Sequence, residues 1–279
     1  MTGNTLRIGN PTSSEIVRLL GYGERDMTEA ELEARPKKGT GSKTTTIKDA
    51  KLFDGTAYEY ISECNMERRL KRSIDSEIVA KPTTWGKLCE IYVYETPGII
   101  SLDYQVNLDK TTAHPEHPYW AGSEDFLKEY TVSDLKCPNS LKSYCQLVDP
   151  YYVGGLTGMA YINAICNGWE HEGVKYKKHP DGEKYKWQLI SNACIHGKSK
   201  GELIIFCPYE SELLQIQQIA ERETCYKWIV NAAANELPYL KEDSIYKNVT
   251  AIEFEIPQAD KDFLTSKVIA ASKLLQPFS

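Results

Sequence analysis

Two acidic residues and a lysine lie close together in one short stretch of the chain, and their types suit metal-dependent hydrolysis. Asp134 and Lys136 fall in a strand-like run, where alternating side chains place both on one face while Leu135 points into the core. Asp125 opens the preceding strand-like run. If the two runs pair as a hairpin, Asp125 comes beside Asp134, and two carboxylates converge with one ammonium group. Charges inside an apolar strand pattern are costly unless they serve a site.

This set of residues predicts metal-assisted cleavage of a phosphodiester bond. Carboxylates are hard oxygen ligands that suit Mg²⁺ or Mn²⁺. A bound metal polarises a phosphoryl oxygen and lowers the pKa of a bound water. A lysine orients the attacking water and offsets the charge that develops in the transition state. The spacing alone also fits a surface ion pair, which is common in charged proteins.

The segment resembles the active-site hairpin of the PD-(D/E)xK nuclease superfamily, and most closely its phage-type recombination exonucleases, the lambda-exonuclease and YqaJ-like family. The family core is Ser-Pro-Asp-Gly followed by Glu-Leu-Lys-Cys-Pro, with Ile or Val also found in place of Leu. This chain has Ser-Glu-Asp-Phe at 123–126 and Asp-Leu-Lys-Cys-Pro at 134–138. Trp-Gly-Lys-Leu-Cys-Glu at 85–90 is similar to the family's upstream helix motif, and Tyr-Lys-Trp-Gln at 185–188 to the helix after the catalytic strands. Glu124 and Phe126 depart from the usual proline and glycine.

The resemblance implies a site and a cofactor. Mg²⁺, with Mn²⁺ as a substitute, would be held by Glu90, Asp125, Asp134 and the carbonyl of Leu135. Glu95 or Glu67 is the alternative to Glu90. The resemblance further implies that Lys136 positions the attacking water and that Gln188 supports Lys136. The expected catalytic residues are therefore Glu90, Asp125, Asp134, Lys136 and Gln188.

The resemblance also implies an activity and partners. A metal-dependent deoxyribonuclease would degrade one strand of linear double-stranded DNA from its 5′ end in phage or mobile-element recombination. A single-strand annealing protein would be its partner, and a homo-oligomer, by resemblance a trimeric ring, its assembly. The alternatives are an endonuclease, a RecB-type or CRISPR-associated nuclease, or a catalytically silent DNA-binding protein on the same fold.

The net charge of -6 excludes a protein that binds nucleic acid by bulk positive charge, but not one with a local basic groove. Basic residues concentrate in 35–51, 67–72 and 175–186. A solvated helix face is the alternative interpretation of the run at 67–72. The side chains that we expect to contact DNA are Arg68, Arg69, Arg72, Lys184, Tyr185 and Lys186.

The cysteines and the chain's hydropathy predict a cytoplasmic protein. The eight cysteines are scattered, without a Cys-x-x-Cys pair, so we expect reduced thiols and no iron–sulfur cluster. No apolar run has the length of a membrane span, and residues 1–10 have no apolar segment typical of a secretory signal.

Alternating helix and strand patterns predict an α/β fold with a mixed central sheet flanked by helices, the restriction-endonuclease-like core. We expect one nuclease domain over 1–279, with a flexible basic loop at 35–51 (a linker or a DNA-touching arm), an insertion at 141–184 and a C-terminal strand and helix within 236–279. Strands are expected at 98–108, twice within 126–137, at 203–208 and at 249–256. Helices are expected at 13–20, 53–78, 185–194, 211–235 and 260–275, and 85–95 fits either type. The expected buried side of 53–78 is Tyr58, Ile61, Met66 and Leu70.

Overall fold

The computed structural model describes residues 5–34, 45–74, 80–101, 103–107 and 111–278. Its centre is a five-stranded sheet in the order β11-β10-β7-β6-β3. The strands are β3 (Gln105–Val106), β6 (Phe126–Leu127), β7 (Thr131–Lys136), β10 (Lys200–Phe206) and β11 (Val249–Glu255). β7 and β10 are parallel, and the other neighbours are antiparallel. The sheet is therefore mixed, which confirms the predicted fold class.

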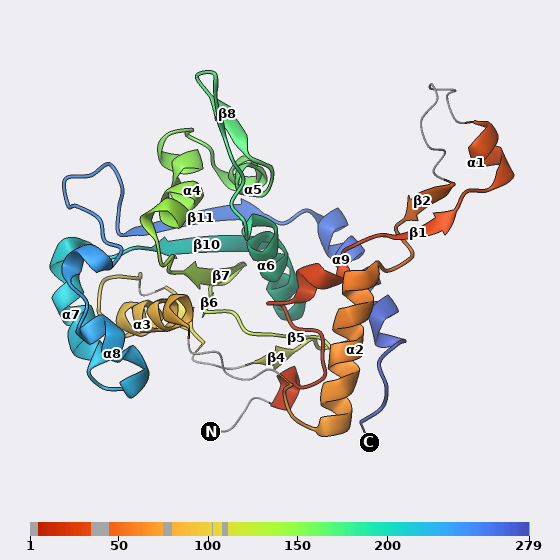
Figure 1. The fold of residues 1–279 in the computed structure, drawn as a ribbon, viewed down its shortest axis with the longest axis horizontal. Helices are drawn as coiled ribbons and strands as arrows, with labels where there is room; N and C mark the ends of the chain where they lie inside the picture. Colours follow the sequence, from red (N-terminus) through yellow and green to blue (C-terminus); the bar gives the residue numbers. More distant parts are fainter. Residues whose placement is uncertain (1–4, 35–44, 75–79, 102, 108–110, 279) are drawn as a thin grey trace.

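Helices cover both faces of this sheet (Figure 1). The side chains of one buried cluster come from α2 (Gly55–Leu70), α4 (Leu141–Tyr152), α5 (Gly158–Asn167), α6 (Gly182–His196) and α9 (Gln258–Ser272). Those of a second cluster come from α3 (Lys81–Glu95), α7 (Leu213–Ala220) and α8 (Lys227–Val230). None of the described helices has the length and apolar character needed to cross a membrane.

In the part of the chain that the structure describes, three small strand pairs and a short helix α1 (Glu29–Glu33) lie outside the central sheet. They are β1 (Gly23–Asp26) with β2 (Thr46–Asp49), β4 (Thr112–Ala113) with β5 (Ala121–Gly122), and β8 (Trp169–His171) with β9 (Val174–Tyr176). The β8–β9 hairpin and the β1–β2–α1 arm project from the body (Figure 1). Because 46–49 forms a strand, the predicted loop at 35–51 is wrong there, and 35–44 lie outside the described residues.

The alternation of side chains along the central strands decides which face carries the candidate site. Val132, Leu203 and Ile205 belong to the cluster that contains α6, whereas Leu135 and Ile204 belong to the cluster that contains α3. Asp134 and Lys136 share the parity of Val132, so they lie on the α6 face of β7. Leu135 points into the opposite part of the core, as predicted.

The buried side of α2 differs from the prediction. Ile61 is buried as expected, but Tyr58, Met66 and Leu70 are exposed. The buried stripe instead follows the helical period through Ala57, Tyr60, Ile61, Cys64 and Arg68. Sequence reasoning missed it because the stripe ends on a charged residue. Arg68 packs its aliphatic stem and directs its guanidinium to oxygens of the protein.

Other predicted elements are shorter than expected. The segment expected as one helix at 211–235 is divided into α7, α8 and three short 3-10 turns. The break at 221–224 is exposed, and Arg222 there forms an ion pair of 2.6 Å with Glu95 of α3. Among the described residues of the strand expected at 98–108, only Gln105–Val106 form a strand. The helix expected at 13–20 is the 3-10 turn Ile16–Leu19. The ambiguous segment 85–95 is helical, within α3.

The segment expected as an insertion, 141–184, contains α4, α5 and the β8–β9 hairpin. α4 and α5 are part of the main core, since Tyr144, Leu147, Tyr161 and Ile162 are fully buried against it. Only the β8–β9 hairpin extends away from this core (Figure 1). The origin of the segment as an insertion stays a prediction.

Candidate active site

The β6–β7 hairpin brings the two predicted aspartates together. Phe126 pairs with Ser133 and Leu127 with Val132, so the same register places Asp125 opposite Asp134. The backbone N–H of Asp125 donates to the carbonyl of Ser133 at 3.2 Å, which continues the ladder to that point. The hairpin expected from the sequence is present, and its pairing juxtaposes the carboxylates.

Asp134, Lys136 and Gln188 form one connected polar group between β7 and α6. Asp134 is almost fully buried, and its Oδ2 lies 2.5 Å from the Lys136 Nζ as an ion pair. Its Oδ1 accepts a hydrogen bond of 2.8 Å from the Gln188 side-chain amide. The carbonyl of the same amide accepts from Lys136 at 3.4 Å. Gln188 therefore holds both charged groups with the two ends of one side chain.

The lysine of this group stays charged. Burial by itself lowers the pKa of Lys136, but Asp134 and Asp125 outweigh burial and hold the pKa above its usual value. The ammonium also lies 5.0 Å from the centroid of the Tyr185 ring, where the ring face attracts a cation. Burial raises the pKa of Tyr185 to about 12, so the ring carries a neutral hydroxyl. Tyr185 thus lies beside this polar group, one helical turn from Gln188.

Asp125 is held by two donors and destabilised by its surroundings. Its Oδ2 accepts from the Leu135 backbone N–H at 2.6 Å, and its Oδ1 accepts from the Tyr94 hydroxyl at 3.2 Å. Burial raises the pKa of Asp125 to about 8, and the nearby Asp134 and Glu90 carboxylates add to the rise. Like charges crowded in a buried place favour the protonated acid. A buried carboxyl whose pKa is shifted this far is a candidate for a functional group.

Glu90 reaches this site from α3. It lies four residues before Tyr94, so both side chains follow one face of the helix. Glu90 is half-buried, and its charge acts on the titration of both Asp125 and Tyr94. The structure thus surrounds the hairpin with α3 on one side and α6 on the other.

The carboxylates around the hairpin are the groups that could hold a metal ion. Within the described ranges, no three Asp, Glu, His or Cys side chains form a ready metal-ligand cluster. In this arrangement Lys136 binds Asp134 and the Leu135 N–H binds Asp125, so both carboxylates already have partners. The chemistry nevertheless fits a hard divalent cation. Asp134 Oδ2 is buried and has no hydrogen bond beyond its ion pair, and the Asp134 and Glu90 carboxylates lie close enough to Asp125 to raise its pKa in addition to burial.

The predicted DNA-contacting arginines lie on and after α2. Arg68 is buried, and its guanidinium donates to the carbonyls of Gly9 and Gln276 and to the side chain of Asn10, at 2.6–2.9 Å. All these bonds stay within the protein, so we exclude Arg68 from the proposed DNA surface. Arg69 is exposed and donates to the Gln276 side chain, and Arg72 is exposed beyond the end of α2.

The two lysines that flank Tyr185 point to different neighbours. Lys184 is partly exposed and forms an ion pair of 3.1 Å with Glu15. Lys186 is mostly buried and pairs at 2.9 Å with Asp260 of α9. Only Lys184 shares a helix face with Gln188, because the two are four residues apart. Lys184 therefore fits a surface that leads to the site better than Lys186 does.

Two supporting groups were missed by sequence reasoning. Tyr94 binds Asp125, and assigning 85–95 as a helix would have revealed it at the fourth position after Glu90. Glu124, next to Asp125, is buried and accepts from Asn107 at 2.8 Å, and its other oxygen lies 2.6 Å from the His196 ring nitrogen. His196 ends α6, so this pair ties the start of the hairpin to the helix that carries Gln188. Nothing in the local sequence around Glu124 indicates a partner so far along the chain.

Comparisons with known proteins place this arrangement in a known fold. The sequence matches no family model and no curated protein. The structure resembles a phage-related exonuclease from Haemophilus somnus 129PT, with a TM-score of 0.52 and 12% identity over 95% of this chain and 92% of that one. It also resembles the alkaline exonuclease LHK-Exo from Laribacter hongkongensis, with a TM-score of 0.47 and 14% identity over 97% of this chain and 90% of that one. LHK-Exo in complex with dAMP gives a TM-score of 0.46 and 12% identity over the same shares. The chain therefore has the fold of the phage-related exonuclease, in agreement with the resemblance drawn from its motifs.

Proposed function

We propose that this protein is a Mg²⁺-dependent exonuclease that degrades linear double-stranded DNA. The observation that carries the proposal is the convergence of Asp125, Asp134, Lys136 and Gln188 at the β6–β7 hairpin. Folding does not require such a group, because burying two carboxylates and an ammonium is costly. The shared fold with the phage-related exonuclease supports the same assignment. Fold alone does not decide function, so the proposal depends on the site.

Each residue of the group has a proposed task. Asp125, Asp134, Glu90 and the carbonyl of Leu135 would hold Mg²⁺ or Mn²⁺. When bound, the metal ion supplies the positive charge that activates the phosphodiester for hydrolysis. Lys136 orients a water molecule and offsets negative charge in the transition state. Gln188 holds the Lys136 ammonium and the Asp134 carboxylate in a fixed relative position, and Tyr94 orients Asp125.

The finer features of the proposal follow from the family that the motifs resemble. We propose hydrolysis from the 5′ end, a role in phage or mobile-element recombination, a single-strand annealing protein as partner and a homo-oligomeric assembly. Arg69, Arg72, Lys184 and Tyr185 are the proposed DNA contacts, because their side chains lie at the surface or beside Lys136.

The activity is tested with end-labelled linear duplex DNA and covalently closed circular duplex DNA, incubated with Mg²⁺ or with a chelator. We expect loss of the linear DNA only, from the 5′ end, and no reaction with the chelator. Nicking of the circle would instead indicate an endonuclease. The absence of cleavage in Mg²⁺ and in Mn²⁺ would indicate a DNA-binding protein without catalytic activity.

The assignment of the site is tested with Asp134→Asn. We expect cleavage to fall by at least about 100-fold, because the variant loses a carboxylate ligand and the ion pair with Lys136. The change keeps the side-chain volume, so the fold should be retained, as checked by circular dichroism. Asp243→Asn, an exposed carboxylate on a distant loop, is the matched control and should cleave like the wild type. Activity of Asp134→Asn within about tenfold of the wild type would contradict the assignment.

A further inference from the structure

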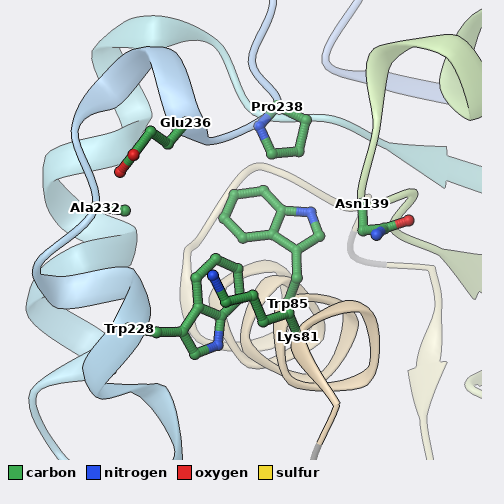
Figure 2. A pocket seen from close by; sticks show the side chains of 7 residues that line it. All are labelled: Lys81, Trp85, Asn139, Trp228, Ala232, Glu236 and Pro238. Atoms are coloured by element: carbon green, nitrogen blue, oxygen red, sulfur yellow. The ribbon is translucent and has the colours of Figure 1, made fainter.

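A small cavity lies between the start of α3 and α8, on the side of the sheet opposite α6. Its volume is about 240 Å³, and its lining is mostly aromatic and polar. Figure 2 shows the Trp85 indole at its centre, with Trp228 and Lys81 together below and Asn139 and Glu236 on opposite sides. Sites for drug-sized ligands hold roughly 300–1,000 Å³, so this cavity suits one smaller planar group.

The two indoles are fixed in place before any ligand arrives. The Trp85 N–H donates to the carbonyl of Pro138 at 3.2 Å, and the Trp228 N–H donates to the Thr84 hydroxyl at 2.9 Å. Trp85 is 1% exposed and forms the floor, whereas Trp228 is partly exposed. Because both polar edges already have partners, the part of Trp228 left for a ligand is its apolar ring. A rigid aromatic surface of this kind binds with little loss of conformational entropy.

The cavity and the candidate active site share two elements, α3 and the end of β7. Asn139 follows Lys136 by three residues, which is a separation of up to about 10 Å at roughly 3.3 Å per residue. Trp85 lies on the same helix as Glu90, and it binds the backbone just after the catalytic strand. Successive nucleotides of one DNA strand are about 3.4 Å apart along the helix axis. A strand that passes from the hairpin around the end of β7 would therefore bring a base to the cavity within a few nucleotides.

We propose that this cavity is a subsite for one nucleobase of the DNA strand held at the catalytic hairpin, an inference that rests on the proposed function. The base would stack on Trp228, as bases stack on aromatic side chains in proteins that bind single strands. The Lys81 ammonium now lies 5.0 Å from the centroid of the Trp228 ring and would pair with the phosphate of the same nucleotide. Asn139 is exposed at the rim and offers an amide to the polar edge of the base.

The subsite is tested on the wild-type protein with DNA duplexes that carry a short single-stranded 5′ end. A single abasic site is placed at each position in turn, and equilibrium binding is measured by fluorescence anisotropy with a chelator present to keep the DNA intact. Losing one stacked base weakens binding by about 5- to 150-fold, so we expect a loss of that size at one position near the end. A profile that is flat along the strand would overturn the proposal.

Variants assign the effect to the cavity. We expect Trp228→Ala to bind intact DNA as weakly as the wild type binds the critical abasic DNA, and to be insensitive to that abasic site. Trp228→Phe keeps a smaller ring and should recover part of the affinity. Trp169→Ala, which removes an indole stacked on Tyr176 in the β8–β9 hairpin, is the matched control and should keep the wild-type profile. Retention of the position effect in Trp228→Ala would overturn the assignment, and the wild-type profile decides the case if that variant does not fold.

Cleavage of linear DNA in Mg²⁺ is measured in parallel, so that the two proposals fail separately. Cleavage together with a flat abasic profile overturns the nucleobase subsite and leaves the exonuclease. The absence of both cleavage and DNA binding overturns the exonuclease and the subsite with it.

Discussion

Gln188 shows how one uncharged side chain organises two charged ones. Its amide donates to Asp134 and accepts from Lys136, so neither end can rotate without losing a bond to a buried charge. The ion pair between Asp134 and Lys136 is thereby held in one geometry. We infer that Gln188 acts through these two residues: it positions them and does not itself react.

The charge balance around Asp125 makes stability depend on pH. Its pKa of about 8 in the folded protein exceeds the ordinary value of an unfolded aspartate, so the folded state binds the proton more tightly. The stability that Asp125 contributes is complete below about pH 4 and is lost as the pH rises towards about 8. We expect Asp125→Asn, which stays neutral, to show a smaller fall in the free energy of unfolding across this range. Urea unfolding at pH 5, 6.5 and 8 with a chelator checks this.

The same group links pH to metal binding. A carboxyl group must lose its proton to ligate a cation, so the affinity for Mg²⁺ should rise with pH up to about 8. Equal pH dependence of unfolding in the wild type and in Asp125→Asn would show that Asp125 is not the group responsible.

At the scale of elements, α6 ends at Gly197, whose backbone has a left-handed conformation that only glycine adopts without strain. Gly197 has φ +62°, and no atom lies within 4 Å of the position that an added Cβ would take. Gly197→Ala would therefore strain the backbone without creating a clash. We expect it to lower the free energy of unfolding by about 1 kcal/mol. Gly55→Ala, at the first position of α2 and equally free of contacts, is the control, and it should be neutral or stabilising by up to about 1 kcal/mol.

Thermal and urea unfolding of these two alanine variants decide the comparison. A loss of stability of similar size in both variants would show that the left-handed conformation is not the cause. Because α6 carries Gln188 and Tyr185, loosening its end in Gly197→Ala should also affect cleavage more than Gly55→Ala does.

The elements that were predictable from sequence are those whose pattern is local. The β6–β7 hairpin, β10, β11, α6 and α9 follow from local patterns of apolar and polar residues. The buried face of α2 was not predictable, because Arg68 is a charged residue that is nevertheless buried. Its guanidinium is satisfied by carbonyl oxygens of residues far along the chain. The division of 211–235 at the exposed break 221–224 is accompanied by an ion pair between Arg222 and Glu95 of α3, a partner far along the chain. The centre of the candidate site could be predicted because Asp125, Asp134 and Lys136 lie on or beside the two strands of one hairpin. The bonds of Glu124 depend on tertiary structure and could not be predicted.

At the scale of the whole molecule, Arg68 ties together three distant segments. Its guanidinium donates to Gly9 and Asn10 near the start of the chain and to Gln276 near its end, and it stacks on Phe278. We expect Arg68→Met to lower the free energy of unfolding by about 2–4 kcal/mol, because several buried acceptors lose a charged donor. The variant should cleave and bind DNA like the wild type at temperatures where it is folded.

Arg69→Met is the matched control for this prediction. Arg69 is exposed and bonds only to the side chain of Gln276 among the interactions described, so its loss should change stability by no more than about 0.5 kcal/mol. Unfolding curves are measured for both variants, and anisotropy with duplex DNA is measured for Arg68→Met and the wild type. A large loss of DNA affinity in Arg68→Met, with its stability unchanged, would restore the phosphate-contacting role that the sequence suggested.

The parallel pairing of β7 with β10 has a consequence for the order of folding. The β6–β7 hairpin closes a short loop and forms from neighbouring residues, whereas Lys200 meets Thr131 only after the whole intervening chain, including α6, has been laid down. Contacts of such long sequence separation are slow to form, because chain entropy is lost before they contribute. The two aspartates thus come together early, and Gln188 reaches them late. A molecule trapped between these two steps has the two aspartates together but lacks the Gln188 contacts. The return of activity during refolding should therefore lag behind the return of local secondary structure.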